Sequence, residues 1–140
     1  MVLLAPNKWK HRKQFRGRVT GKAQRGNRVS FGEFGMKATS GGYVTNRQLE
    51  AARKVIVRIT RKVGKVWMRV FPDLPYTKKA LEMPMGSGKG DVSTYRVRVH
   101  PGRVLFEISG VAKEEAEKVL MQAGYKLPVK VSLVGRDEVN

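Results

Sequence analysis

The sequence predicts a single α+β domain with mainly antiparallel strands and two helices, preceded by a basic arm. Segments that alternate with the period of a strand lie before, between and after two segments with helical periodicity, and no linker or internal repeat separates them. The 41% share of hydrophobic residues in 140 residues is enough for one core. We therefore divide the chain into an arm of residues 1–28 and a folded domain of residues 29–140.

The arm is defined by its charge. Residues 1–65 contain seventeen basic and two acidic side chains, whereas residues 66–140 contain twelve and nine. Self-repulsion on this scale destabilises a free compact chain but favours association with phosphates, because each neutralised phosphate releases condensed counterions. Nucleic acid is therefore the expected partner. The arm itself has no acidic residue and nine cations: Lys8, Lys10, Arg12, Lys13, Arg16, Arg18, Lys22, Arg25 and Arg28.

Two aromatic residues, Trp9 and Phe15, are interleaved with these cations. A segment that follows an RNA strand needs this combination, because the cations contact phosphates and the rings stack on unpaired bases. The alternative is that the rings anchor the arm to the protein core.

The first half of the folded domain is predicted to contain a short strand and a helix. Residues 28–34 alternate with a period of two, which places Val29 and Phe31 on one face of a strand. Residues 40–42 predict a turn. Thr45 and Gln48 then have the spacing of a capping box, and we expect a helix of about four turns that ends with Gly64 in a left-handed C-cap.

This helix is predicted to have one apolar and one basic face. The apolar face consists of Leu49, Ala52, Ile56, Ile59 and Val63. The basic face supplies the candidate RNA-binding residues Arg47, Arg53, Lys54, Arg58 and Lys62. Glu50 is the only acid on the helix, so ion pairs within the helix are not expected to neutralise this face.

The second half is predicted to be richer in strands. Residues 66–71 favour a strand, which the prolines of residues 72–75 end in a loop. Residues 78–92 lack periodicity and contain three glycines, which predicts a long loop. Alternation over 95–99 and 104–108, around Pro101 and Gly102, predicts a β-hairpin.

A second helix and a last strand complete the predicted domain. Residues 112–123 have helical periodicity, with Ala112 as the first residue of the apolar face and an exposed face that is mostly acidic. Gly124 is expected to stop this helix, and residues 129–134 alternate like a strand.

The segment GSGKG at residues 86–90 invites comparison with a phosphate-binding loop, since glycines let backbone amides approach an anion. The nucleotide-binding pattern fails in detail, because Met83 and Gly90 occupy the positions that require Gly and Ser or Thr. The remaining interpretations are a solvated loop and a loop placed against RNA, and the charge of the arm favours RNA.

Residues typical of catalytic and metal-binding sites are scarce in the sequence. There is no cysteine, there are only two histidines, and no carboxylate pair with a metal-binding or acid–base arrangement is evident. We therefore expect no enzymatic activity, no cofactor, no metal and no small-molecule substrate. No apolar run reaches the roughly 18 to 20 residues that span a bilayer. The protein is expected to be cytoplasmic, with no membrane partner.

Six collinear blocks resemble the bacterial form of the large-subunit ribosomal protein sixteen family. They are PNKWKHRKQFRGR at 6–18, VSFG at 29–32, TNRQLEAAR at 45–53, WMRVFPD at 67–73, MGSGKG at 85–90 and PGRVLFE at 101–107. The resemblance covers nearly the whole chain.

This resemblance implies a non-enzymatic component of the large ribosomal subunit with a fold of the α/β-hammerhead type. Members of the family bind large-subunit ribosomal RNA between the central protuberance and the peptidyl-transferase region, support subunit assembly and help to position A-site and P-site tRNA. The implied partners are that RNA, tRNA and neighbouring ribosomal proteins. The arm and the basic helix face would lie on ribosomal RNA. The residues implied to lie closest to tRNA are Met85, Gly86, Ser87, Gly88, Lys89 and Gly90.

The sequence departs from the family at one position of the loop. Many bacterial members have an arginine directly before the Met-Gly pair, in some cases hydroxylated, but this chain has Pro84. That modification cannot be transferred, and proline is expected to stiffen the loop. Two alternatives to the ribosomal function remain open: a general architectural protein that binds RNA or DNA, and an RNA-modifying enzyme that uses the glycine loop and Lys89.

Overall fold

The computed structural model describes residues 4–137. Along this part of the chain the elements are β1 (Phe34–Ala38), β2 (Gly42–Thr45), α1 (Asn46–Thr60), β3 (Lys65–Met68), β4 (Leu74–Lys78), β5 (Asp91–Val99), β6 (Val104–Ser109), α2 (Lys113–Gly124) and β7 (Val131–Gly135). Residues 4–33 contain neither a helix nor a strand.

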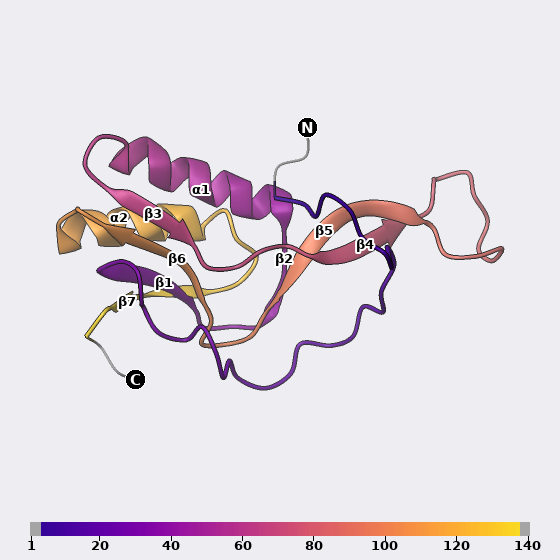
Figure 1. Cartoon of the computed structure of the whole chain (residues 1–140), viewed down its shortest axis with the longest axis horizontal. Coiled ribbons are helices and arrows are strands. Elements are labelled where there is room, and N and C mark those ends of the chain that lie inside the picture. Colours follow the sequence, from indigo (N-terminus) through magenta and orange to yellow (C-terminus); the bar gives the residue numbers. More distant parts are fainter. Residues whose placement is uncertain (1–3, 138–140) are drawn as a thin grey trace.

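The strands form two antiparallel sheets. One has four strands in the order β3-β6-β1-β7, and the other has three in the order β2-β5-β4. The two helices pack against each other, with α2 also against β1 and β7 and α1 against β3. In Figure 1 the β4–β5 pair extends away from the helices and carries the loop of residues 79–90 at its far end. The predicted α+β class is confirmed.

The core lies between the helices and the four-stranded sheet. Met36 of β1 is opposite Phe106 of β6 in the strand register, and both are almost completely buried. Leu49 and Ile56 of α1 are fully buried as well. Burying a side chain of this kind contributes about 1.5–3 kcal/mol relative to leaving it exposed.

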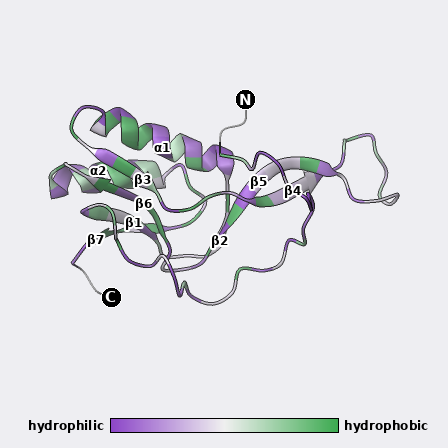
Figure 2. Ribbon diagram, viewed as in Figure 1, coloured by the Kyte–Doolittle hydropathy of each residue, from purple (hydrophilic) through white to green (hydrophobic). Residues whose placement is uncertain are grey.

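The start of α1 agrees with the sequence prediction. The side chain of Thr45 accepts a hydrogen bond from the amide of Gln48 at 3.3 Å, and the side chain of Gln48 accepts one from the amide of Thr45 at 2.9 Å. Two N–H groups that the helix leaves unpaired are thereby satisfied. Figure 2 shows hydrophobic and hydrophilic residues together along α1, as expected for a helix with one packed and one exposed face.

The end of α1 differs from the prediction. The helix stops at Thr60, and of the predicted apolar face Ile59 is 37% exposed and Val63 is 77% exposed. Gly64 does not adopt the left-handed conformation. A Cβ atom at Gly64 would instead lie 2.9 Å from the carbonyl oxygen of Ser109, so glycine allows the chain before β3 to approach the end of β6.

The predicted strand at 28–34 is wrong, because β1 begins only at Phe34. Val29 is buried but Phe31 is 59% exposed, so the two residues do not share a buried face. The amides of residues 30–32 donate to the carboxylate of Glu107 instead of to a neighbouring strand. The amides of this segment thus bond to a side-chain carboxylate instead of to the main chain of a neighbouring strand.

The predicted hairpin around residues 101 and 102 is also wrong, although both of its strands exist. β5 pairs with β2 and β4, whereas β6 pairs with β1 and β3. The chain crosses from one sheet to the other at this turn, where the amide of Gly102 donates to the carbonyl oxygen of Ala38 at 2.7 Å. Local alternation cannot distinguish a hairpin from such a crossing, because the pairing partners are distant in sequence.

The predicted loop at 72–75 is confirmed only for residues 72 and 73, which belong to a loop of residues 69–73. β3 ends early, at Met68, and β4 starts at Leu74 and contains Pro75. β4 is an edge strand of its sheet, and an edge strand tolerates a residue without an N–H group.

The remaining elements lie close to their predicted positions. The long loop joins β4 to β5, α2 ends at Gly124 as expected, and β7 overlaps the predicted last strand. Ala112 is exposed and precedes α2, so it does not belong to the buried face. No helix in residues 4–137 is long and apolar enough to cross a membrane.

Candidate nucleic-acid interface

The arm lies along the body of the protein. In Figure 1 it passes from the start of α1 along the β4–β5 pair and then returns beneath the three-stranded sheet to β1. All nine of its cations are exposed. Their charge therefore faces solvent while the main chain of the arm follows the protein surface.

Hydrogen bonds to the main chain of the arm hold it in this course. The Tyr43 hydroxyl shares its proton between the carbonyl oxygens of Arg16 and Gly17, at 2.7 and 2.8 Å. Nearer to the end of the arm, the amide of Ala23 donates to Pro101 at 2.9 Å, and the carbonyl oxygen of Gly26 accepts from the amide of Val104 at 2.8 Å. These contacts do not use the cationic side chains of the arm.

The two aromatic residues of the arm have different environments. Trp9 is partly buried, as an anchoring residue would be. Phe15 is 93% exposed, and the ammonium nitrogen of Lys89 lies 5.9 Å from the centre of its ring. Of the two alternatives from the sequence, anchoring therefore suits Trp9, and a ring free to stack suits Phe15.

The basic face of α1 is present but is smaller than predicted. Arg47, Lys54 and Arg58 are exposed on the helix, and Lys62 is exposed in the turn that follows it. Arg53, however, forms a two-bonded ion pair with Glu50, at 2.9 and 2.5 Å. The hydrogen bond from Arg53 is the main cause that lowers the pKa of Glu50. Arg53 is thus already paired within the helix, whereas the other four candidates are not.

The tip of the long loop is exposed and consists largely of apolar residues and glycine. Met85 is 94% exposed, and residues 86–88 all have a positive φ, between 60° and 103°. Lys79 donates to the carbonyl oxygens of Pro84, at 3.3 Å, and of Gly86. A cation inside the loop therefore fixes its shape without taking part in the exposed tip.

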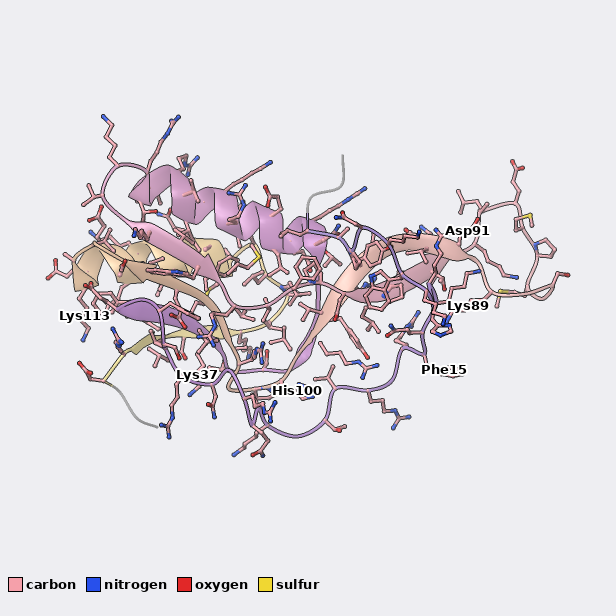
Figure 3. All side chains as sticks on the ribbon, viewed as in Figure 1. Phe15, Lys37, Lys89, Asp91, His100 and Lys113 are labelled. Carbon is pink, nitrogen blue, oxygen red and sulfur yellow. The ribbon has the colours of Figure 1, made fainter. Side chains whose placement is uncertain are left out.

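Lys89 is separated from the other predicted loop residues. Its side chain turns back to the arm and donates to the carbonyl oxygen of Gln14 at 2.7 Å, and Lys13 donates to the carbonyl oxygen of Lys89 at 3.0 Å. Figure 3 shows Lys89 and Phe15 next to each other, at the end of the β4–β5 pair from which the loop starts. The structure thus brings together residues 85–88 at the tip and places Lys89 with the arm.

Sequence reasoning missed a buried ion pair beneath the end of the arm. Glu107 is fully buried, accepts three amides from residues 30–32 at 3.1, 2.6 and 2.8 Å, and is paired with Arg69. Burial raises the pKa of this carboxyl, but the bonds from Gly32, Ser30, Phe31 and Arg69 outweigh burial, so the pKa is lowered. An acid in the middle of the apolar run VLFEI was the available signal.

Three further arginines were not predicted as part of the interface. Arg98 donates to the carbonyl oxygen of Arg16 at 2.7 Å, and Arg103 donates to those of Arg25 at 3.1 Å and Arg69 at 3.2 Å. Arg96 lies over the ring of Tyr76, 3.7 Å from its centre. Alternation of Arg96 and Arg98 with valines indicated one polar face of β5, but only the structure shows that the arm contacts it.

Comparison with known proteins identifies the family. The model of the family described as ribosomal protein L16p/L10e matches residues 6–134. The large ribosomal subunit protein uL16 of Halorhodospira halophila is 52% identical over 134 residues, which cover 96% of this chain and 98% of that protein. The uL16 proteins of Borrelia recurrentis and Staphylococcus aureus strain Newman are 50% and 47% identical, each over 98% of this chain and over 99% and 95% of their own lengths.

These matches extend over the arm, the basic helix and the long loop together, as well as over the folded core. The resemblance to the bacterial ribosomal protein is therefore confirmed. The chain belongs to the L16p/L10e family of ribosomal proteins, in its bacterial form, and is a structural constituent of the ribosome and not an enzyme.

Proposed function

We propose that this protein is built into the large ribosomal subunit, where it binds large-subunit ribosomal RNA, supports subunit assembly and helps to position A-site and P-site tRNA. Neighbouring ribosomal proteins of the cytoplasmic ribosome complete its surroundings. The relatives that match nearly the whole chain are named large ribosomal subunit proteins, which supports the subunit assignment.

One observation supports the proposed binding of ribosomal RNA most directly. The nine cations of residues 8–28 are all exposed, and none of them forms an ion pair with another residue in the part of the chain described by the structure. So many unpaired like charges along one segment repel each other until a polyanion neutralises them. Four exposed cations extend this surface, namely Arg47, Lys54 and Arg58 of α1 and Lys62 in the turn after it.

The tRNA-positioning part depends on the long loop. Its tip lies beyond the end of the β4–β5 pair, away from the helices (Figure 1). Met85 is exposed and Gly86 and Gly88 carry no side chain, so the tip could approach an RNA backbone closely. Within the predicted loop set, we assign residues 85–88 to tRNA, with Lys89 and Gly90 at the base of the loop.

The experiment is quantitative mass spectrometry of salt-washed ribosomal subunits separated on a sucrose gradient. We expect about one copy of the protein for each large subunit after a wash that removes purely adventitious basic proteins, whose binding weakens steeply with salt. Recovery of the protein only in fractions of free nucleic acid would instead support a general architectural binder. Competition between ribosomal RNA and duplex DNA would then separate these two functions.

A further inference from the structure

A cationic cavity lies where the arm crosses the β4–β5 pair. Its volume is about 180 Å³, and its lining includes Gln14 and Arg16 of the arm, Tyr76 of β4, Lys89, and Arg96 of β5. Three of these residues are cations, and no acidic residue lines the cavity. None of these residues belongs to α1, and Tyr76 and Arg96 were not predicted from the sequence to bind RNA.

The positions of two cations in the cavity are fixed by one aromatic ring. The guanidinium carbon of Arg96 is 3.7 Å and that of Arg16 is 4.9 Å from the centre of the Tyr76 ring. Neither arginine forms an ion pair with a residue between 4 and 137. Their charges are thus held near each other and stay unneutralised by the protein itself.

Arg96 also has a donor without an acceptor. Its Nε atom is buried and makes no hydrogen bond to any described residue. Leaving a buried donor unsatisfied costs about 1–3 kcal/mol, more when the group is charged. Because this atom is not exposed, an acceptor from outside the protein would remove this cost only with a shift of the Arg96 side chain.

The size and charge of the cavity restrict what this acceptor can be. Pockets for small-molecule ligands have volumes of about 300–1,000 Å³, so this cavity suits a smaller group. Three cations favour an anion. Arginine presents parallel N–H groups that match two oxygens of a phosphate, and a guanidinium fixed by stacking loses little freedom when it binds.

We propose that this cavity binds one backbone phosphate of large-subunit ribosomal RNA. Arg96 is the fixed donor, Arg16 and Lys89 supply the remaining charge, and Tyr76 positions the two guanidinium groups. The proposal rests on the RNA-binding function proposed above and adds a defined site to it. Because the lining comes from the arm, the β4–β5 pair and the base of the loop, the phosphate would join these three parts.

The test compares the affinity of the full chain for large-subunit ribosomal RNA over a range of potassium chloride concentrations. Losing one phosphate contact lowers the slope of the logarithm of the affinity against the logarithm of the salt concentration by about one. We expect this change for Arg96→Gln, together with a loss of affinity of roughly tenfold, the low end of what one hydrogen bond to a charged group contributes. Lys113→Gln removes an exposed cation far from Lys89 (Figure 3) and should leave the slope unchanged.

Other outcomes would overturn the proposal in distinguishable ways. Weaker binding of Arg96→Gln with an unchanged slope would mean that Arg96 acts only through protein packing. A slope that changes for tRNA but not for ribosomal RNA would assign the phosphate to tRNA. Failure of the wild-type chain to bind ribosomal RNA at all would instead remove the proposed function itself.

A second measurement covers the case in which Arg96→Gln does not fold. Arg96→Lys keeps the charge and loses the paired N–H groups. Ribosomal RNA that carries random phosphorothioate substitutions tests each phosphate separately. Substitution at one phosphate should weaken the binding of the wild-type protein but should not weaken the binding of Arg96→Lys. An identical interference pattern for both proteins would contradict a phosphate bound by Arg96.

Discussion

Lys89 and Gln14 are 75 residues apart in the sequence, and the ammonium group of Lys89 donates a 2.7 Å hydrogen bond to the carbonyl oxygen of Gln14. Lys13 donates in return to the carbonyl oxygen of Lys89. This reciprocal contact connects the basic arm to the base of the long loop. An RNA that fixes the arm would thus also restrict the loop.

The first prediction concerns Lys89→Ala. The substitution removes the bond to Gln14 and leaves the exposed cations of the arm unchanged. We expect large subunits that contain the protein at full occupancy but accommodate A-site tRNA more slowly, because the loop loses one of the two hydrogen bonds that join it to residues 13 and 14 of the arm. Accommodation kinetics in reconstituted ribosomes measure this.

Lys78→Ala is the matched control for that experiment. Lys78 is an exposed cation at the end of β4, and its side chain does not line the cationic cavity. Normal accommodation with Lys89→Ala would contradict the prediction. An equal effect of both substitutions would attribute it to lost charge alone.

The second prediction concerns the arm. We expect a chain without residues 1–28 to be absent from salt-washed large subunits, because deletion removes nine exposed cations together with the main-chain contacts to Tyr43 and Arg98. Quantitative mass spectrometry of purified subunits measures the occupancy, and full occupancy of the shortened protein would refute the prediction.

A charge-only variant separates these two losses. Lys8, Lys10, Arg12 and Arg18 are exposed. Changing all four to Gln should leave the thermal unfolding midpoint of the free chain within a few degrees of the wild-type value. The variant should nevertheless dissociate from the large subunit at a lower salt concentration than the wild type. Retention identical to wild type would mean that the shape of the arm, and not its charge, determines binding.

The third prediction concerns Glu107→Ala. The carboxylate is fully buried and accepts three amides and Arg69, so its removal leaves buried donors without a partner. Removing one member of a buried ion pair costs about 3–5 kcal/mol. The side chain of Arg69 is 19% exposed and can regain some hydration, so we expect about 3 kcal/mol, the low end of that range.

Urea denaturation followed by circular dichroism measures this change in the free energy of unfolding of the full chain. Glu33→Ala removes an exposed carboxylate directly after residues 30–32, whose amides Glu107 accepts. It is expected to change the free energy of unfolding by about 0.5 kcal/mol or less. Similar values for the two variants would show that the Glu107 contacts add nothing to stability.

The fourth prediction is a dependence of stability on pH. The pKa of Glu107 is below its ordinary value of 4.5 in the folded protein, so the unfolded chain binds the proton more readily. Its contribution should therefore be constant from neutral pH down to about 4.5 and disappear as the pH falls through the folded pKa. Urea titrations at successive pH values below about 4.5 should show a steeper loss in the free energy of unfolding for wild type than for Glu107→Gln.

The sequence determined the features that depend on neighbouring residues. The capping pair Thr45 and Gln48, the helical stripe of Leu49, Ala52 and Ile56, and the strand-like alternation of β5 and β6 are all local patterns, and each element formed close to its predicted place. Charge is also independent of folding, so the basic arm could be identified by counting residues.

Only the tertiary structure decided which distant groups meet. The strands on either side of Pro101 joined different sheets, and the segment around Phe31 gave its amides to Glu107, because these pairings involve residues far apart in sequence. For the same reason the family resemblance could group Lys89 with residues 85–88 as nearest to tRNA, whereas in the fold its side chain turns back to Gln14. Sequence spacing determines local conformation, and composition determines total charge. Contacts between residues far apart in the sequence depend on how the whole chain packs.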